Sequence, residues 1–213
     1  ILSMTLEDIA KKMCAKGKGI LAADESTGTI AKRFNSINVE NTEVNRLAFR
    51  ETLFKSEAIK NYIGGIILFD ETIRQKTSSG LSVPELIVKN GSIPGIKVDK
   101  GAKVLSGSPE ETVTEGLDGL RDRLKEYYKL GARFTKWRAV IKITDNYPTV
   151  QCIKSNSHAL ARYAAMVQEC NMVPIVEPEV LMDGSHDIDK CYNVTENLLN
   201  DCYEQPSFTQ HRF

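Results

Sequence analysis

The sequence has little of what marks membrane, secreted or metal-binding proteins. Its longest apolar run, Tyr62–Phe69, is far shorter than the about 20 residues that span a bilayer. The five cysteines are odd in number and form no CxxC pair, which favours a reducing, cytoplasmic location. The three histidines lack the spacing of metal ligands, and no nucleotide-binding fingerprint occurs. We therefore expect no metal and no cofactor.

An excess of charge of either sign is also absent. Lysine and arginine total 28, and aspartate and glutamate total 28. A nucleic-acid-binding protein or a membrane-surface protein usually has a basic excess, so we expect neither kind of partner. The balance does not exclude an anionic substrate, because a few clustered cations are enough to bind a phosphate.

Short apolar runs alternate with longer segments of helical period. The runs predict buried parallel strands at Gly19–Ala23, Gly64–Phe69, Pro94–Val98, Phe134–Val140 and Val173–Val176. Amphipathic stripes predict helices between them, near Leu117–Tyr128 and Val150–Val167, with further helices beginning near Thr5 and at Ile188–Tyr203. This alternation predicts an α/β fold with right-handed crossovers, either an open doubly wound sheet or a closed barrel.

Charged residues gather where the predicted strands end. The groups are Asp24-Glu25-Ser26, Lys97 to Gly101, Lys136-Trp137-Arg138 and Glu177-Pro178-Glu179. For any one group, a functional site and a structural explanation are equally good, the structural one being charges that reach solvent or form internal salt bridges. Four groups at one repeated position favour a site, because barrel enzymes place their chemistry at the carboxyl ends of several strands.

The period of two along a strand sorts these charges by face. Lys136 and Arg138 are expected on one face and Trp137 on the other. Glu25 follows Asp24 and is expected to face elsewhere, toward an arginine or a lysine. Cations and carboxylates on one face suit a polyanionic substrate and acid–base chemistry.

Several of these segments resemble class I fructose-bisphosphate aldolase. They are GILAADESTGTIAKR (Gly19–Arg33), NVENTEVNR (Asn38–Arg46), GIKVDKG (Gly95–Gly101), EGLDGL (Glu115–Leu120), KWR (Lys136–Arg138) and VPIVEPE (Val173–Glu179). The resemblance covers residues 6 to 203. It implies a (β/α)8 TIM barrel, here incomplete with about five of its eight strand–helix units. It also implies the glycolytic and gluconeogenic lyase that cleaves fructose 1,6-bisphosphate to dihydroxyacetone phosphate and glyceraldehyde 3-phosphate through a lysine imine (Schiff base).

The resemblance also implies residue roles in catalysis. Asp24 matches the aspartate that handles the C4 hydroxyl of the substrate, and Lys136 the lysine that assists imine formation. Glu177 matches the acid–base carboxylate of carbinolamine dehydration. Glu179 is a possible supporting residue, with a purely structural ion pair as the alternative.

Five further positions match substrate-binding residues of the family. Lys97 and Arg138 match basic residues near the phosphate and the hydroxyls of the substrate. Ser26 and Thr29 match hydroxyls that contact one phosphate, where threonine replaces the family's usual serine. Arg33 matches an arginine associated with the other phosphate.

The resemblance stops before the sixth strand of the family. Residues 1–203 are interpreted as the N-terminal part of one barrel, and residues 204–213 as an irregular tail that matches nothing in the family. No lysine here matches the imine-forming one, so we expect a truncated fragment that is inactive alone.

The first and fifth strands of this fragment would be open edges, which favours marginal stability or aggregation. Expected partners are a sugar phosphate and, in the homotetrameric family, other aldolase subunits. The alternative is a non-catalytic isoform that binds or regulates full-length aldolase.

Overall fold

A computed structural model describes residues 4–206, which form helices and strands in alternation. The helices are α1 Leu6–Met13, α2 Thr27–Asn35, α3 Glu43–Phe54, α4 Glu57–Tyr62, α5 Asp70–Ile73, α6 Val83–Lys89, α7 Leu120–Leu130, α8 Val150–Glu169 and α9 Ile188–Glu204. The strands are β1 Gly19–Ala23, β2 Ile63–Leu68, β3 Ile93–Lys97, β4 Ala102–Leu105, β5 Ser108–Thr114, β6 Phe134–Ile141 and β7 Val173–Val180. Within this range no helix combines the length and apolar character needed to cross a membrane.

Five strands form one sheet in the order β1-β2-β3-β6-β7. The pairs β1–β2 and β2–β3 are parallel, with Ala23 opposite Leu68 and Leu68 opposite Ile96. The carboxyl ends of these neighbouring strands therefore lie side by side. Each of the five strands coincides with a predicted apolar run.

The chain divides into two compact units. The first contains residues up to 97, with 124–135 and 171–173. The second contains residues 98–123, 136–170 and those from 174 onward. The two units are described separately below.

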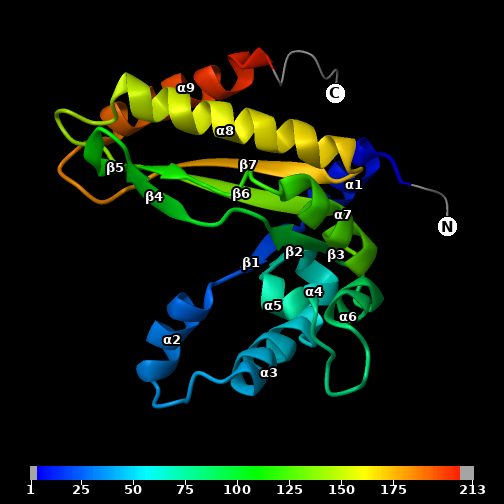
Figure 1. Cartoon of the computed structure of the whole chain (residues 1–213). Helices are drawn as coiled ribbons and strands as arrows, with labels where there is room; N and C mark the ends of the chain where they lie inside the picture. The colour runs from blue at the N-terminus through cyan, green and yellow to red at the C-terminus, as the bar shows by residue number, and fades with distance from the viewer. Residues whose placement is uncertain (1–3, 207–213) are drawn as a thin grey trace. The chain divides into compact units, whose positions relative to one another are not determined.

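The first unit holds β1, β2, β3 and helices α1 to α6 (Figure 1). Its core includes Ile66 and Leu68 of β2, Ile96 of β3 and Phe54 of α3, all fully buried. α1 begins as expected, because Thr5 and Asp8 form a reciprocal capping box. The side chain of Ser26 caps α2 in the same manner, by accepting a hydrogen bond from the backbone N–H of Thr29.

The second unit packs α8 on strands and α9 on α8 (Figure 1). Trp137 of β6 and Tyr163 of α8 are fully buried, with ring centroids 5.3 Å apart. The Tyr163 hydroxyl donates to the carbonyl of Ile175 in β7 at 3.1 Å, which fixes the helix against this strand. Beside them, β4 and β5 form an antiparallel hairpin.

Three features differ from the sequence-based expectations. The β4–β5 hairpin was not predicted, because the β5 sequence SPEETVT is too polar to look like a strand. α7 begins at Leu120 rather than near Leu117, since Gly116 and Gly119 adopt positive φ angles of 135° and 68° that a helix does not allow. β7 continues through Glu177 and Glu179 to Val180, so these carboxylates lie within the strand and not beyond its end.

The C-terminal prediction falls partly outside the described residues. α9 continues to Glu204, one residue into the segment expected to be an irregular tail. Residues 207–213 of that segment, with His211, lie outside the part that the structure describes.

Candidate functional site

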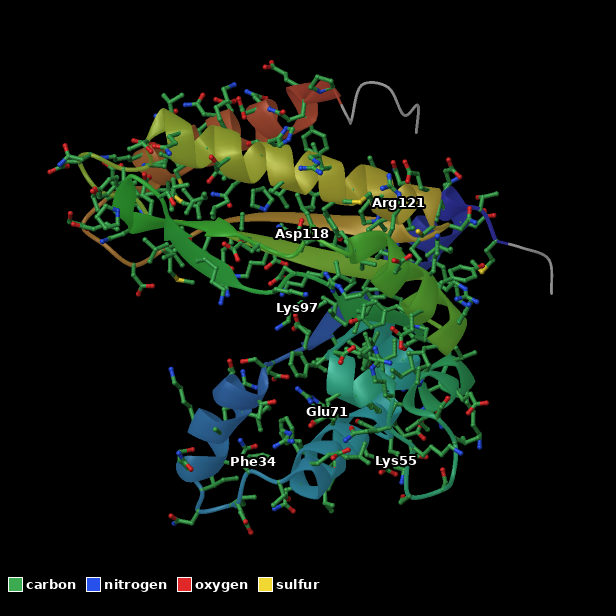
Figure 2. All side chains as sticks on the ribbon, in the orientation of Figure 1. Phe34, Lys55, Glu71, Lys97, Asp118 and Arg121 are labelled. Carbon is green, nitrogen blue, oxygen red and sulfur yellow. The ribbon has the colours of Figure 1, made fainter. Side chains whose placement is uncertain are left out.

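In the first unit, the ends of β1 and β3 bring Asp24 and Lys97 together. Asp24 directly follows β1 and is buried, while Lys97 is the last residue of β3. The ammonium of Lys97, which is labelled in Figure 2, donates to the backbone carbonyl of Asp24 at 2.8 Å. It also lies 5.1 Å from the ring centroid of Phe69, at the end of β2, which is cation–π distance. The predicted grouping of charges at strand ends therefore occurs in this unit.

Two predicted hydroxyl residues lie at the start of α2, Ser26 as its N-cap and Thr29 in its first turn. Ser26 Oγ and Thr29 Oγ1 are 3.0 Å apart, and Ser26 Oγ also accepts from the Thr29 N–H at 3.3 Å. The start of a helix favours negative charge because its first N–H groups point outward without helical partners. This pair of hydroxyls is suited to donate to an anion, as the resemblance implies for a phosphate.

Arg33, the predicted ligand of the other phosphate, is ion-paired with Glu25. Arg33 Nη1 contacts Glu25 Oε1, and Arg50 Nη2 lies 3.7 Å from Glu25 Oε2. Glu25 thus faces arginines, as its sequence position indicated, although these belong to helices α2 and α3. Arg50 is fully buried, and burial lowers its pKa although Glu25 and Glu71 act in the opposite direction.

A second arginine of α3 forms a two-pronged ion pair. Arg46 donates through Nε and Nη2 to the two carboxylate oxygens of Glu71, at 2.8 and 2.7 Å. These hydrogen bonds lower the pKa of Glu71 and raise that of Arg46. Bidentate pairs of this kind are the strong ones, so this pair joins α3 firmly to α5.

Sequence reasoning missed Arg46, Arg50 and Glu71 as supporting residues. A signal for the arginines was present, because positions 46 and 50 are four apart and share one face of a helix. A helix face that carries two arginines next to buried Phe54 indicates internal carboxylate partners. The sequence offered no way to choose Glu71 and Glu25 as those partners.

In the second unit, β6 and β7 present two cation–carboxylate pairs. Lys136 Nζ lies 3.5 Å from Glu177 Oε1, and Arg138 pairs with Glu179. The pair with Glu179 raises the pKa of Arg138. Trp137 lies between the two cations in sequence and is fully buried, as expected for the opposite face. The period of two therefore sorted these side chains correctly, and Glu179 has an arginine as its partner.

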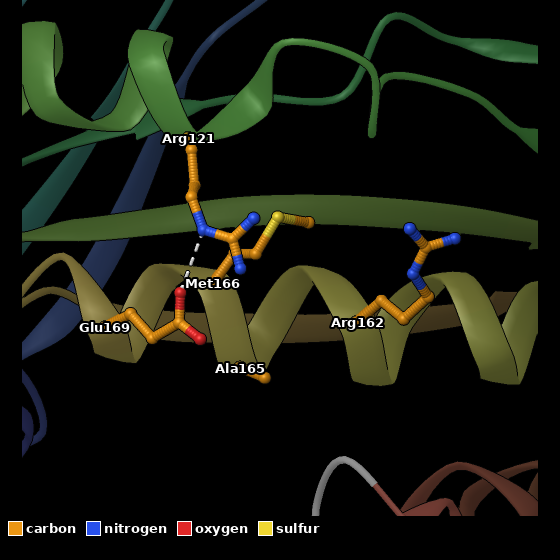
Figure 3. A pocket seen from close by; sticks show the side chains of 5 residues that line it. All are labelled: Arg121, Arg162, Ala165, Met166 and Glu169. Carbon is orange, nitrogen blue, oxygen red and sulfur yellow. Dashed lines mark hydrogen bonds and ion pairs between the residues drawn. The ribbon is translucent and has the colours of Figure 1, made fainter.

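A surface hollow on α8 contains none of the predicted site residues. It is lined by Arg121, Arg162, Ala165, Met166 and Glu169, and Arg121 Nε donates to Glu169 Oε2 at 3.0 Å (Figure 3). Most of these residues lie on one face of α8. Two arginines compensated by one glutamate on a helix surface are an ordinary solvated face, so we assign the hollow no role.

Metal ligation has no support in the described range, where no cluster of three or more histidine, cysteine or carboxylate side chains could hold an ion. His158 is exposed on α8.

The thiols of Cys152 and Cys202 are buried, and burial raises the pKa of Cys152 to about 12. Such thiols are protonated and unreactive at neutral pH. Cys14, which follows α1, is exposed.

Comparison with protein-family models matches residues 5–211 to fructose-bisphosphate aldolase class-I. A probable fructose-bisphosphate aldolase class 1 of Xanthomonas axonopodis pv. citri is 61% identical over 204 residues, which are 94% of this chain and 61% of that relative. The cytosolic fructose-bisphosphate aldolase 4 of Arabidopsis thaliana is 60% identical over 188 residues, which are 88% of this chain and 48% of that protein. The chain thus spans about three fifths or less of the length of these curated relatives.

A solved structure of fructose-bisphosphate aldolase from Plasmodium falciparum, in complex with TRAP and a small-molecule inhibitor, has the same fold. The TM-score is 0.92 at 47% sequence identity, over 95% of this chain and 58% of that chain. The expectation of an incomplete (β/α) barrel is thereby confirmed, and the open doubly wound sheet is excluded.

Proposed function

The chain belongs to the class I fructose-bisphosphate aldolase family, and from this premise we propose that it binds fructose 1,6-bisphosphate and carries acid–base residues of its cleavage. The products of that reaction are dihydroxyacetone phosphate and glyceraldehyde 3-phosphate. The observation that supports the proposal most directly is the Lys136–Glu177 pair, 3.5 Å apart on strands β6 and β7.

This pair has the composition that imine chemistry needs. Dehydration of a carbinolamine requires a group that donates a proton to the departing hydroxyl. A carboxyl group held in place by a lysine can exchange a proton with that hydroxyl. In our proposal Glu177 performs this step and Lys136 polarises the reacting oxygen. Arg138, oriented by Glu179, binds a hydroxyl or phosphate of the sugar.

In the first unit, Asp24 takes the proposed role of handling the C4 hydroxyl. Burial of Asp24 beside the end of β3 favours a fixed geometry, and Lys97 supplies a cation at that end. Ser26 and Thr29 are the proposed hydroxyl donors to one phosphate, and Arg33 is the proposed ligand of the other. These functional groups match a substrate with two phosphates better than a neutral sugar.

We further propose that the 213-residue chain does not form the imine, because no lysine in it matches the family's imine-forming residue. Binding without turnover would then be its activity. The second candidate function is therefore a non-catalytic partner of other aldolase subunits, which is favoured by the half-exposed edge strand β1. A homotetramer and a cytoplasmic location are proposed from the family and from the cytosolic plant relatives.

Calorimetry with fructose 1,6-bisphosphate and borohydride trapping test these proposals. We expect Lys136→Met to weaken binding by about tenfold, the effect of losing a charged hydrogen bond. Lys142→Met is the matched control, because Lys142 follows β6 and pairs with exposed Glu110. Equal effects of the two substitutions would contradict the proposed site. Borohydride reduction in the presence of substrate should leave the chain unlabelled, and a covalent adduct would show that it forms an imine after all.

A further inference from the structure

Glu25 is ion-paired with Arg33, the arginine that our proposed function assigns to a phosphate. Its Oε1 contacts Arg33 Nη1, and its side chain is mostly buried whereas that of Arg33 is 57% exposed. An arginine side chain that is this exposed is well suited to bind an anion from solution. Here the position is already taken by a carboxylate of the same chain.

The carboxylate is held from the interior by Arg50. The Arg50 side chain is only 1% exposed, and its Nη2 lies 3.7 Å from Glu25 Oε2. The same Nη2 donates to the backbone carbonyl of Glu25 at 2.5 Å, and Nη1 donates to Thr72 Oγ1 at 2.7 Å. Arg50 thus holds the backbone of Glu25 by a hydrogen bond and attracts its carboxylate by charge, so a ligand that takes Arg33 must displace the carboxylate against this attraction.

A carboxylate and a phosphate use the same N–H donors of a guanidinium. A phosphate that approaches Arg33 must therefore displace Glu25 or bind beside its negative charge. Both events weaken anion binding. They weaken it most for singly charged anions, because a phosphate dianion gains more from the guanidinium and can compensate the loss.

We propose that Glu25 is a specificity-determining residue, an internal competitor that holds Arg33 until a dianionic phosphate displaces it. Arg50 is the positioning residue that keeps the competitor in place. The inference rests on the proposed function, since that function makes Arg33 a phosphate ligand. It adds to that function a reason why weakly charged anions do not occupy the site.

Calorimetric titration of the purified chain with inorganic phosphate tests the competition. We expect Glu25→Gln to lower the phosphate dissociation constant by about two- to fivefold, the range that corresponds to one exposed ion pair. Glu40→Gln is the matched control, because it removes one exposed negative charge nearby and has no contact with Arg33 in the described residues. An unchanged or weakened affinity in Glu25→Gln would overturn the proposal.

A double-mutant cycle separates competition from a purely structural role. In the Arg33→Gln background, Glu25→Gln should no longer tighten phosphate binding, because the competed-for guanidinium is gone. The same gain in both backgrounds would contradict the proposal. If Glu25→Gln does not fold, NMR of the Arg33 guanidinium in the unmodified chain decides: its signals should shift as phosphate binds, and binding without any shift would refute displacement.

Repeating the titrations with fructose 1,6-bisphosphate distinguishes this inference from the proposed function. If the bisphosphate binds no better than inorganic phosphate while Glu25→Gln still tightens phosphate binding, the substrate assignment fails and the competition stands. If the bisphosphate binds tightly and Glu25→Gln has no effect on either ligand, the substrate assignment stands and the competition fails.

Discussion

Two arginines of α3, Arg46 and Arg50, form ion pairs with carboxylates of other segments in the first unit. Arg46 donates two hydrogen bonds to the Glu71 carboxylate, and both side chains are largely buried. Removing one member leaves the other charge partly desolvated, which costs more than the pair contributes by itself. The effect on stability should therefore depend on whether Glu71 is ionised.

We predict that Glu71→Gln lowers the free energy of unfolding by about 1–2 kcal/mol at pH 7. Because Arg46 lowers the folded-state pKa of Glu71, the contribution is fully present above the unfolded pKa of about 4.3. It is lost as the pH falls through the folded-state value, so the difference between the two proteins should shrink at low pH. Urea denaturation from pH 7 to pH 3 measures this.

The control for this substitution is Glu57→Gln. Glu57 pairs with Lys60 one turn away on α4, and both side chains are well exposed. Exposed pairs contribute at most about 1 kcal/mol, and commonly much less, so its effect should be small at every pH. Equal losses in the two variants would show that the Arg46–Glu71 geometry has no special role.

The cysteines provide a second prediction at this scale. Burial raises the pKa of Cys152 to about 12 and also raises that of Cys202, whereas Cys14 is exposed. At pH 8 a thiol reagent should label Cys14 quickly and the two buried thiols only after unfolding, because the thiolate is the reactive form. Cys14→Ser should remove the fast phase. Rapid native-state labelling of Cys152, detected by peptide mass, would contradict this expectation.

At the scale of elements, glycines allow strands and side chains to pack closely. A Cβ at Gly95 of β3 would lie 2.3 Å from ring atoms of Phe134, whose side chain is fully buried. A Cβ at Gly64 would lie 2.2 Å from the backbone oxygen of Met13. Neither contact can be relieved by moving a flexible chain end, so these positions require the absence of a side chain.

We predict that Gly95→Ala destabilises the chain by about 1–3 kcal/mol, the usual cost of overpacking a core. The matched control is Gly19→Ala in β1, where the nearest atom to a new Cβ is 4.0 Å away. Guanidinium denaturation of both variants measures the difference. A Gly95→Ala protein as stable as Gly19→Ala would mean that Phe134 can shift at no cost.

At the scale of the whole molecule, the sheet order leaves β1 and β7 at its two ends within the described residues. The neighbouring strand β2 is almost entirely buried, whereas most of β1 is exposed and every residue of β7 is half-buried. Apolar Ile20 of β1 is 37% exposed. Edge strands of a sheet are sites of association when they carry apolar side chains, because their outer backbone groups can pair with another chain.

We therefore predict that the purified chain associates as its concentration rises and that Ile20→Lys reduces this association. A lysine on an edge strand opposes pairing with another chain because its charge would have to be desolvated. Val88→Lys on α6 is the control, since Val88 is exposed and the change in net charge is the same. Sedimentation velocity distinguishes the outcomes. A monomer at all concentrations, or equal effects of both substitutions, would contradict an edge-mediated contact.

Local pattern was sufficient to predict much of the fold and part of the site. The predicted runs beginning at Gly19, Gly64 and Phe134 are apolar enough to indicate buried strands, and strands occur there. The capping box at Thr5 could also be predicted from the sequence, because it depends only on two residues three positions apart. The β4–β5 hairpin was not readable, because its polar strands are held by pairing with each other rather than by an apolar face.

The sequence by itself determined which side chains share a strand face, because alternation is a property of the extended backbone. It therefore placed Lys136 and Arg138 together and turned Trp137 into the core. Only the tertiary structure decided which carboxylate each cation meets. Glu25 contacts both Arg33 and Arg50 because α2 begins just after it and α3 brings Arg50 to its backbone carbonyl, and Coulomb attraction acts on distances that folding alone creates.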